Sequence, residues 1–230
     1  MRPYLVFSLT ATLGAMGELA GHERRGSLVW PGRSAILGLL GAALGIKRGG
    51  DFTALDQLEL AVAVFDPGTP MRDYHTVETV PTAAAKRPNS RPEALMAARR
   101  KTNTTITLRD YRAGVLYGIA VWGDGLDKLA AALERPKFTL YLGRKSCPLA
   151  APPGAKVVDS ESPEAALEQL ELPPWRRLDH NGRPATARVL IAGADTGHWV
   201  NDVPRDRSRW HFSPRRVSLQ NVEIVTGGQT

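Results

Sequence analysis

The side chains most often used for catalysis and metal binding are scarce in this chain. It has a single cysteine, Cys147, and five histidines at positions 22, 75, 180, 198 and 211. No two histidines have the spacing of zinc-binding motifs, and one thiol cannot build a cysteine zinc cluster or an internal disulfide. Residues 143–146 contain part of a phosphate-binding loop without its leading glycine, and no Gly-x-Ser-x-Gly elbow exists. We therefore expect no metal, no cofactor and no nucleotide hydrolysis, with Cys147 as a small buried residue.

Metal-free RNA cleavage is the one catalytic chemistry that the side chains could supply. It needs a base near the 2′-hydroxyl, an acid at the leaving oxygen and a cation for the phosphorane. His22, Tyr74 and His75, near a basic segment, are the candidates for these roles. Any basic protein with five histidines offers a candidate base, acid and cation, so the signal is weak. RNA cleavage therefore remains the alternative to RNA binding.

Positive charge is the strongest chemical signal in the sequence. The 230 residues include 30 lysines and arginines against 23 aspartates and glutamates, and the isoelectric point is about 9.8. The cations gather at 24–33, 86–101, 144–145 and 205–216, where the last group alternates with Trp210 and Phe212. Because exposed bases stack on aromatic rings and phosphates pair with arginine, this pattern favours single-stranded RNA. A general protein scaffold with incidental basicity is the third alternative.

Periodicity predicts strands and helices over the first 149 residues. Strands are expected at 4–9, 58–65, 74–80, 105–122 and 138–142, and helices at 33–44 and 126–133. If the third and fourth strands form one edge with an insertion, the order is the β-α-β-β-α-β of a ferredoxin-like, RNA-recognition-type domain. The inserted segment, about 80–104, carries six cations and Glu93, a balance of +5, and its second half could form a short helix.

The composition changes after residue 149. A Pro/Gly linker at 150–154 precedes an acidic helix that begins near Ser162, and short strands are expected at 188–192 and 217–225. We therefore predict an α+β protein with a domain at 1–149 and a smaller, mainly β domain at 150–230. The longest charge-free apolar stretch, 34–46, is too short to span a membrane, so the cytoplasm is the expected compartment.

Four stretches in register resemble the CRISPR-associated CasD family, the fifth Cas protein of the type I-E Cascade complex. They are the opening strand 1–6, the first-helix motif 33–46, the motif 73–77 and the late signature 141–149, and a weaker match follows at 203–207. After residue 104 the family pattern reads Arg-x-Tyr-Leu-x-Asp. Arg109 and Tyr111 match it, whereas Arg112 and Gly114 stand where Leu and Asp are expected.

The resemblance implies a ferredoxin-like domain with an inserted basic β-hairpin thumb and a small β-rich C-terminal domain. It also implies a non-catalytic subunit that binds the 5′ handle of a CRISPR RNA and caps the backbone filament. The partners would be that RNA, the backbone filament subunit and the large subunit, with target DNA reached through the complex. In a related subtype the corresponding subunit cuts the precursor RNA, which keeps the endoribonuclease alternative open.

The expected RNA contacts combine the basic clusters with these motifs. Arg33 and Ser34 begin a helix whose N–H groups favour a phosphate, and a second phosphate site is expected at residues 144–146. If about five phosphates are neutralised, log K should fall with log salt at a slope of roughly −3.5. The residues expected to bind RNA are Arg24, Arg25, Arg33, Ser34, Lys86, Arg87, Arg91, Arg99, Arg100, Lys101, Arg109, Tyr111, Arg144, Lys145 and Ser146.

Overall fold

The computed structural model describes residues 1–20, 23–85, 90–99, 101–207, 209 and 211–226. Its centre is an antiparallel sheet of four strands in the order β7-β1-β6-β4. These strands are β1 (Arg2–Gly14), β4 (Glu59–Asp66), β6 (Asn103–Trp122) and β7 (Lys156–Ser160). Three of the four match predicted strands. The fourth was predicted at 138–142, and this was wrong, because β7 takes that place beside β1.

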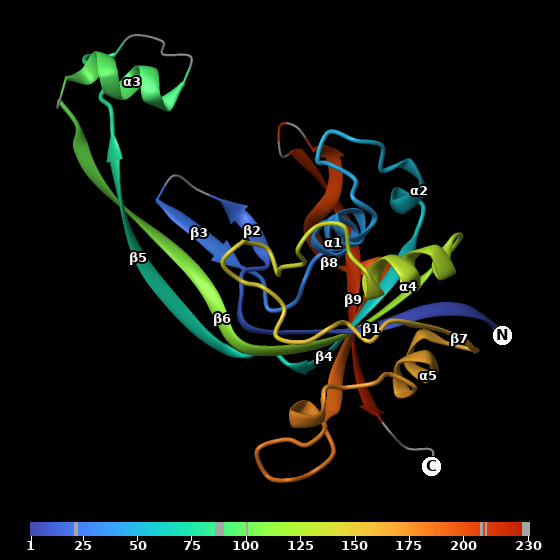
Figure 1. Cartoon of the computed structure of the whole chain (residues 1–230). Coiled ribbons are helices and arrows are strands. Elements are labelled where there is room, and N and C mark those ends of the chain that lie inside the picture. The colour runs from blue at the N-terminus through green and yellow to red at the C-terminus, as the bar shows by residue number, and fades with distance from the viewer. Residues whose placement is uncertain (21–22, 86–89, 100, 208, 210, 227–230) are drawn as a thin grey trace.

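Alternation along β1 divides the core between the two faces of the sheet. Leu5, Phe7 and Leu9 pack with the apolar side of α1 (Arg33–Leu44) and α4 (Leu126–Glu134). Tyr4 and Val6 point the other way and pack with α5 (Pro163–Glu168). Figure 1 shows α1 and α4 on one side of the sheet and α5 on the other. Both faces are covered, so the chemistry of this sheet must lie at its ends and edges.

Helix α1 has the predicted bounds. It starts after Gly32, and it ends at Gly45, whose φ of 81° is the left-handed conformation that glycine adopts without strain. A Cβ at Gly41 would lie 2.5 Å from the ring of Phe52, just before the short helix α2 (Thr53–Asp56), whereas Gly38 has open space beside it. Close packing therefore explains one of the two glycines inside the helix.

A curved arm leaves the sheet where β4 ends. We define the arm as β5 (Thr69–Thr79), residues 103–113 of β6 and the helix α3 (Arg91–Ala98), which lies at the tip. The strands pair without a break from Thr69↔Ala113 to Thr79↔Asn103. In the described part of 80–104 the chain forms a turn at 82–84, helix α3 and the first two residues of β6, so the hairpin is formed almost entirely by residues outside the predicted insertion.

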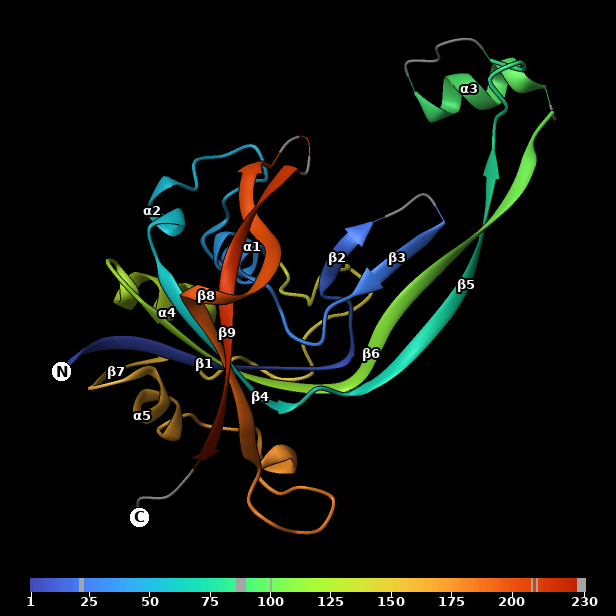
Figure 2. The same cartoon turned by 180° about the vertical axis from the view of Figure 1, so that it is seen from behind.

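Two hairpins complete the fold. The small one joins β2 (Gly17–Ala20) to β3 (Arg24–Ser27), and β3 runs parallel to β6 at the root of the arm. The large one joins β8 (Thr186–Asp206) to β9 (His211–Val225), and β8 pairs with β4. The short helix η1 (Pro174–Arg176) precedes β8. Residues after 150 therefore extend the central sheet on both edges, as Figure 2 shows from behind. No described helix is long and apolar enough to cross a membrane.

Candidate nucleic-acid interface

The loop 143–147 holds a cation against an aromatic ring at the root of the arm. The guanidinium of Arg144 lies 4.4 Å from the ring centroid of Tyr111, a cation–π contact. Cys147 is fully buried beside Tyr111 and Ala15, as predicted, and its N–H donates to the carbonyl of Arg144. Gly143 has a φ of 81°, and a Cβ there would collide with the backbone of Ala15. The loop is thus fixed at both ends, which positions Arg144.

Two predicted arginines join this group on the same face of the arm. Arg109 lies two residues before Tyr111 on β6, so their side chains leave the strand on one side. Arg25 of β3 is in register with Arg109. Arg109 Nε and Arg144 Nη1 are buried and have no hydrogen-bond partner among the described residues. Buried donors without acceptors are rare, so these two N–H groups are available to a water molecule or to an acceptor on a ligand.

The opposite face of the arm carries an ion-pair clamp. Asp110 of β6 accepts hydrogen bonds from Arg72 of β5, at 2.7 and 3.1 Å, and from Arg24 of β3, at 2.9 Å. The Arg72 hydrogen bonds, followed by those of Arg24, lower the pKa of Asp110 from 3.8 to about 2. Arg24, predicted to bind RNA, therefore shares one carboxylate with Arg72. Arg72 and Asp110 were not predicted from the sequence, because the clamp forms only when three strands meet.

The predicted phosphate site at the start of α1 holds a carboxylate instead. The N–H of Arg33 donates to Asp202 Oδ2 at 2.7 Å, and Asp202 also accepts from Arg215 Nε at 2.6 Å. The Arg33 guanidinium donates to the carbonyl of Asp56 at 2.8 Å, and burial lowers its pKa. Ser34 is half-buried next to it. The expectation of a bound phosphate was wrong here, because the helix dipole already has an anion from β8.

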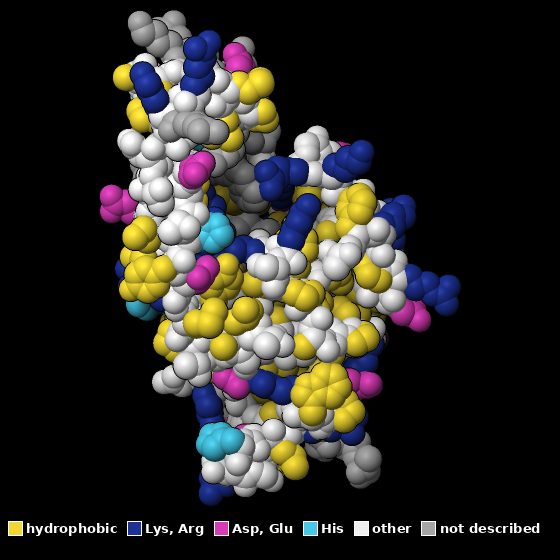
Figure 3. Space-filling view, turned by 60° about the vertical axis from the view of Figure 1, so that its left-hand side comes forward, with side chains coloured by type: hydrophobic (Ala, Val, Ile, Leu, Met, Phe, Trp, Pro, Cys, Tyr) yellow, Lys and Arg dark blue, Asp and Glu magenta, His cyan; other side chains and the backbone are white. Residues whose placement is uncertain are grey.

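Few of the cations predicted in the insertion can be placed. Arg99 and Lys101, next to α3, are exposed near the tip of the arm. Lys86, Arg87 and Arg100 lie outside the described residues, as does the side chain of Arg91. Figure 3 shows a hollow between the arm and the body, with lysine and arginine side chains along its walls. Lys145 and Ser146, in the Arg144 loop, are exposed.

The candidate catalytic residues do not converge in the described structure. Tyr74 and His75 are neighbours on β5, so their side chains point to opposite faces of the arm. His75 Nδ1 lies 3.9 Å from Asp73 Oδ2, and the side chain of Tyr74 is open to solvent. His22 lies outside the described residues. The arrangement therefore does not place the two β5 residues on one substrate.

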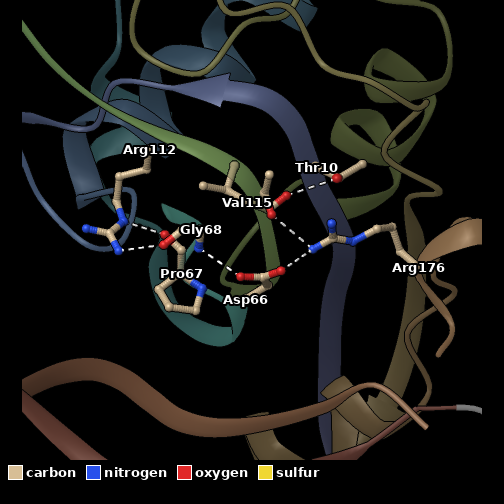
Figure 4. Close-up of polar contacts among 8 residues, drawn as sticks. Thr10, Asp66, Pro67, Gly68, Arg112, Val115 and Arg176 are labelled. Carbon is tan, nitrogen blue, oxygen red and sulfur yellow. Dashed lines mark hydrogen bonds and ion pairs between the residues drawn. The ribbon is translucent and has the colours of Figure 1, made fainter. Parts of the chain in front are cut away.

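Arg112, one of the two departures from the family pattern, holds the turn from which the arm starts. Its guanidinium donates to the carbonyls of Pro67 and Gly68, the latter at 2.7 Å, as Figure 4 shows. In the same turn Asp66 accepts from the N–H of Gly68 and from Arg176, both at 2.8 Å. Arg112, which stands where the family pattern has Leu, therefore adds hydrogen bonds at the root of the arm.

Comparison with known proteins identifies the family. A sequence model described as CRISPR-associated protein (Cas_Cas5) matches residues 4–218. The chain belongs to the Cas5 family. A relative named CRISPR system Cascade subunit CasD, from Escherichia coli (strain K12), is 28% identical over 251 residues, covering 99% of this chain and 98% of the relative.

Two solved structures are similar to this chain in fold. One titled CRISPR RNA-guided surveillance complex contains a chain that is 27% identical, with a TM-score of 0.72 and coverage of 96% of this chain and 91% of that one. A second, titled Crystal structure of Cas protein, is 24% identical, with a TM-score of 0.63 and 98% coverage of both chains. The second likeness supports the fold alone.

Proposed function

We propose that this Cas5-family chain is a non-catalytic subunit of a CRISPR RNA-guided surveillance complex, in which it holds the 5′ handle of the CRISPR RNA. The observation that carries the proposal is the match to the Cascade subunit CasD along essentially the whole of both chains. The proposal extends to capping the end of the backbone filament, with the filament subunit and the large subunit as neighbours. Target DNA would be reached through the complex.

The root of the arm supplies the chemistry for this role. Arg25 and Arg109 lie on the face of the arm that carries Tyr111, Arg144 stacks on the Tyr111 ring, and Lys145 follows Arg144 at an exposed position of the loop. A cationic surface with a stacked guanidinium binds phosphates and unstacked bases of a single strand. Of the residues predicted from the sequence to bind RNA, the proposal keeps those on the Tyr111 face of the arm. It also keeps the exposed Arg99 and Lys101 near the tip.

The proposal also includes the fold of the domain, a ferredoxin-like sheet with an inserted thumb. The order β7-β1-β6-β4, with α1 and α4 on one face, is the arrangement of a ferredoxin-like sheet, and the arm is the proposed thumb. The cytoplasm is the compartment in which a complex guided by CRISPR RNA would work. A boundary near residue 150 would divide the chain into two domains that share one sheet.

Salt-dependent binding of handle RNA to the purified chain tests the proposal. Four neutralised phosphates give a slope of log K against log salt of roughly −2.8. Removing two charges in an Arg109→Ala, Arg144→Ala variant should make the slope shallower by about 1.4. The matched control removes the exposed Lys128 of α4 and the exposed Arg135 directly after that helix, and it should leave the slope unchanged. A slope near zero, or equal loss in both variants, would contradict the proposal.

Incubation with precursor repeat RNA tests the non-catalytic part. Because Tyr74 and His75 diverge, we expect the RNA to stay intact in metal-free buffer. A single cut that His75→Ala abolishes would establish the endoribonuclease alternative instead.

A further inference from the structure

A shallow cavity of about 290 Å³, largely open to solvent, lies at the root of the arm, on the face that carries Tyr111. Its size lies at the lower end of the range of small-ligand sites, which suits a single ring system. The residues that line it are Leu13, Met71, Arg72, Asp73, Tyr111 and Ser146. They come from β1, β5, β6 and the Arg144 loop, so the cavity exists only where these four segments meet.

The walls of the cavity combine apolar and polar groups. Leu13, Met71 and Tyr111 offer apolar surface, and the Tyr111 ring is held by the guanidinium of Arg144. Asp73 and Ser146 add a carboxylate and a hydroxyl. Because Tyr111 itself is only 8% exposed, the guanidinium stacked on its ring is the flat surface on which a nucleobase can stack.

Donors for the backbone of a nucleotide lie beside the cavity. Arg109 is the cross-strand partner of Asp73, and Arg144 covers Tyr111, so both border the lining. Arg109 Nε and Arg144 Nη1 are two of the three buried side-chain donors without an acceptor among the described residues, the third being Trp30 Nε1. A phosphate oxygen is the acceptor that best satisfies arginine. Two arginines with free N–H donors, Arg109 and Arg144, therefore lie beside the cavity. The cavity wall itself carries the carboxylate of Asp73.

We propose that this cavity holds one unstacked nucleotide with an amino-bearing base, and that Asp73 selects it. The inference rests on the proposed RNA-binding function and adds base selectivity to it. A carboxylate only accepts hydrogen bonds, so it pairs with the exocyclic amino group of adenine, cytosine or guanine. Uracil has carbonyl oxygens on both sides of its one N–H, and these repel the carboxylate. Asp73 thus excludes uracil from the cavity.

Binding of short homopolymers to the full chain tests the inference. Eight-nucleotide oligo(A), oligo(C) and oligo(U) are titrated against wild type, Asp73→Asn and Asp195→Asn. The last variant removes the same charge from an exposed position of β8. We expect wild type and Asp195→Asn to prefer oligo(A) and oligo(C) over oligo(U) roughly tenfold. Asp73→Asn should bring this ratio close to one, because an amide can also donate to a uracil carbonyl.

The outcomes separate the inference from the function on which it rests. If wild type binds all three oligomers with equal affinity, or if Asp73→Asn keeps the wild-type ratio, base selection by Asp73 is overturned while RNA binding stands. If no oligomer and no handle RNA binds, the proposed function is overturned as well.

Discussion

The clamp at Asp110 leads to a quantitative prediction for the substitution Asp110→Asn. Lowering the pKa of Asp110 from 3.8 to about 2 corresponds to a contribution of roughly 2.5 kcal/mol to the free energy of unfolding, before screening by solvent is taken into account. The side chains of Arg24 and Arg72 are 60% and 42% exposed, so water and salt screen much of that free energy. We therefore expect Asp110→Asn to lower the free energy of unfolding by about 1 kcal/mol at pH 7.

The sign of the pH dependence follows from the lowered pKa of Asp110. The stabilisation is fully present above the pKa of the unfolded state, near pH 4, and is lost as the pH falls toward 2. Urea unfolding of wild type and Asp110→Asn measures it, with Asp195→Asn as the charge-matched control. The difference should be constant from pH 7 to 5, shrink below pH 4 and be smaller in 0.5 M salt. Equal stability at pH 7, or a difference that persists at pH 2, would refute the reasoning.

Two further predictions concern the stability of the loop 143–147 and of the β8–β9 hairpin. Gly143→Ala should destabilise by more than about 1 kcal/mol, because it combines a positive φ with a collision against Ala15. Gly125→Ala has a φ of 78° but open space, so its melting temperature should fall less, and an equal fall would contradict the collision. Asp202→Ala should cost about 3 kcal/mol in urea unfolding, because it leaves the largely buried Arg215 without its anion. A loss under 1 kcal/mol would show that Arg215 is solvated instead.

Local patterns predicted the ends of two helices, α1 and α5, well. Helix α1 has its predicted bounds, because its apolar run ends at a glycine that adopts positive φ. The helix that begins after Ser162 was also predicted, and Ser162 Oγ accepts from the N–H of Ala165 at 3.2 Å. In each case the deciding interaction lies within a few residues of the helix end.

The predicted strand at 138–142 failed because alternation reports burial on one side, not pairing. Leu140 and Leu142 are both buried in the core under α1 and α4, as the alternation indicated. Their backbones, however, bond to the loop: Leu142 donates to Cys147, and Leu149 donates to Leu140. The segment thus forms the loop that presents Arg144 to Tyr111.

Strand pairing, which the sequence does not show, decides which of the predicted cations has a carboxylate partner. Arg24 and Arg25 are equivalent in a count of local charge. Once β3 lies parallel to β6, Arg24 lies on the face of Asp110 and shares that carboxylate with Arg72, whereas Arg25 lies on the face of Arg109. The two strands are about 80 residues apart in the chain, so no local window contains this information. A one-residue slip of β3 against β6 would exchange the roles of Arg24 and Arg25. The register of these strands, rather than the net charge, therefore sets the number of cations that the proposed RNA can contact.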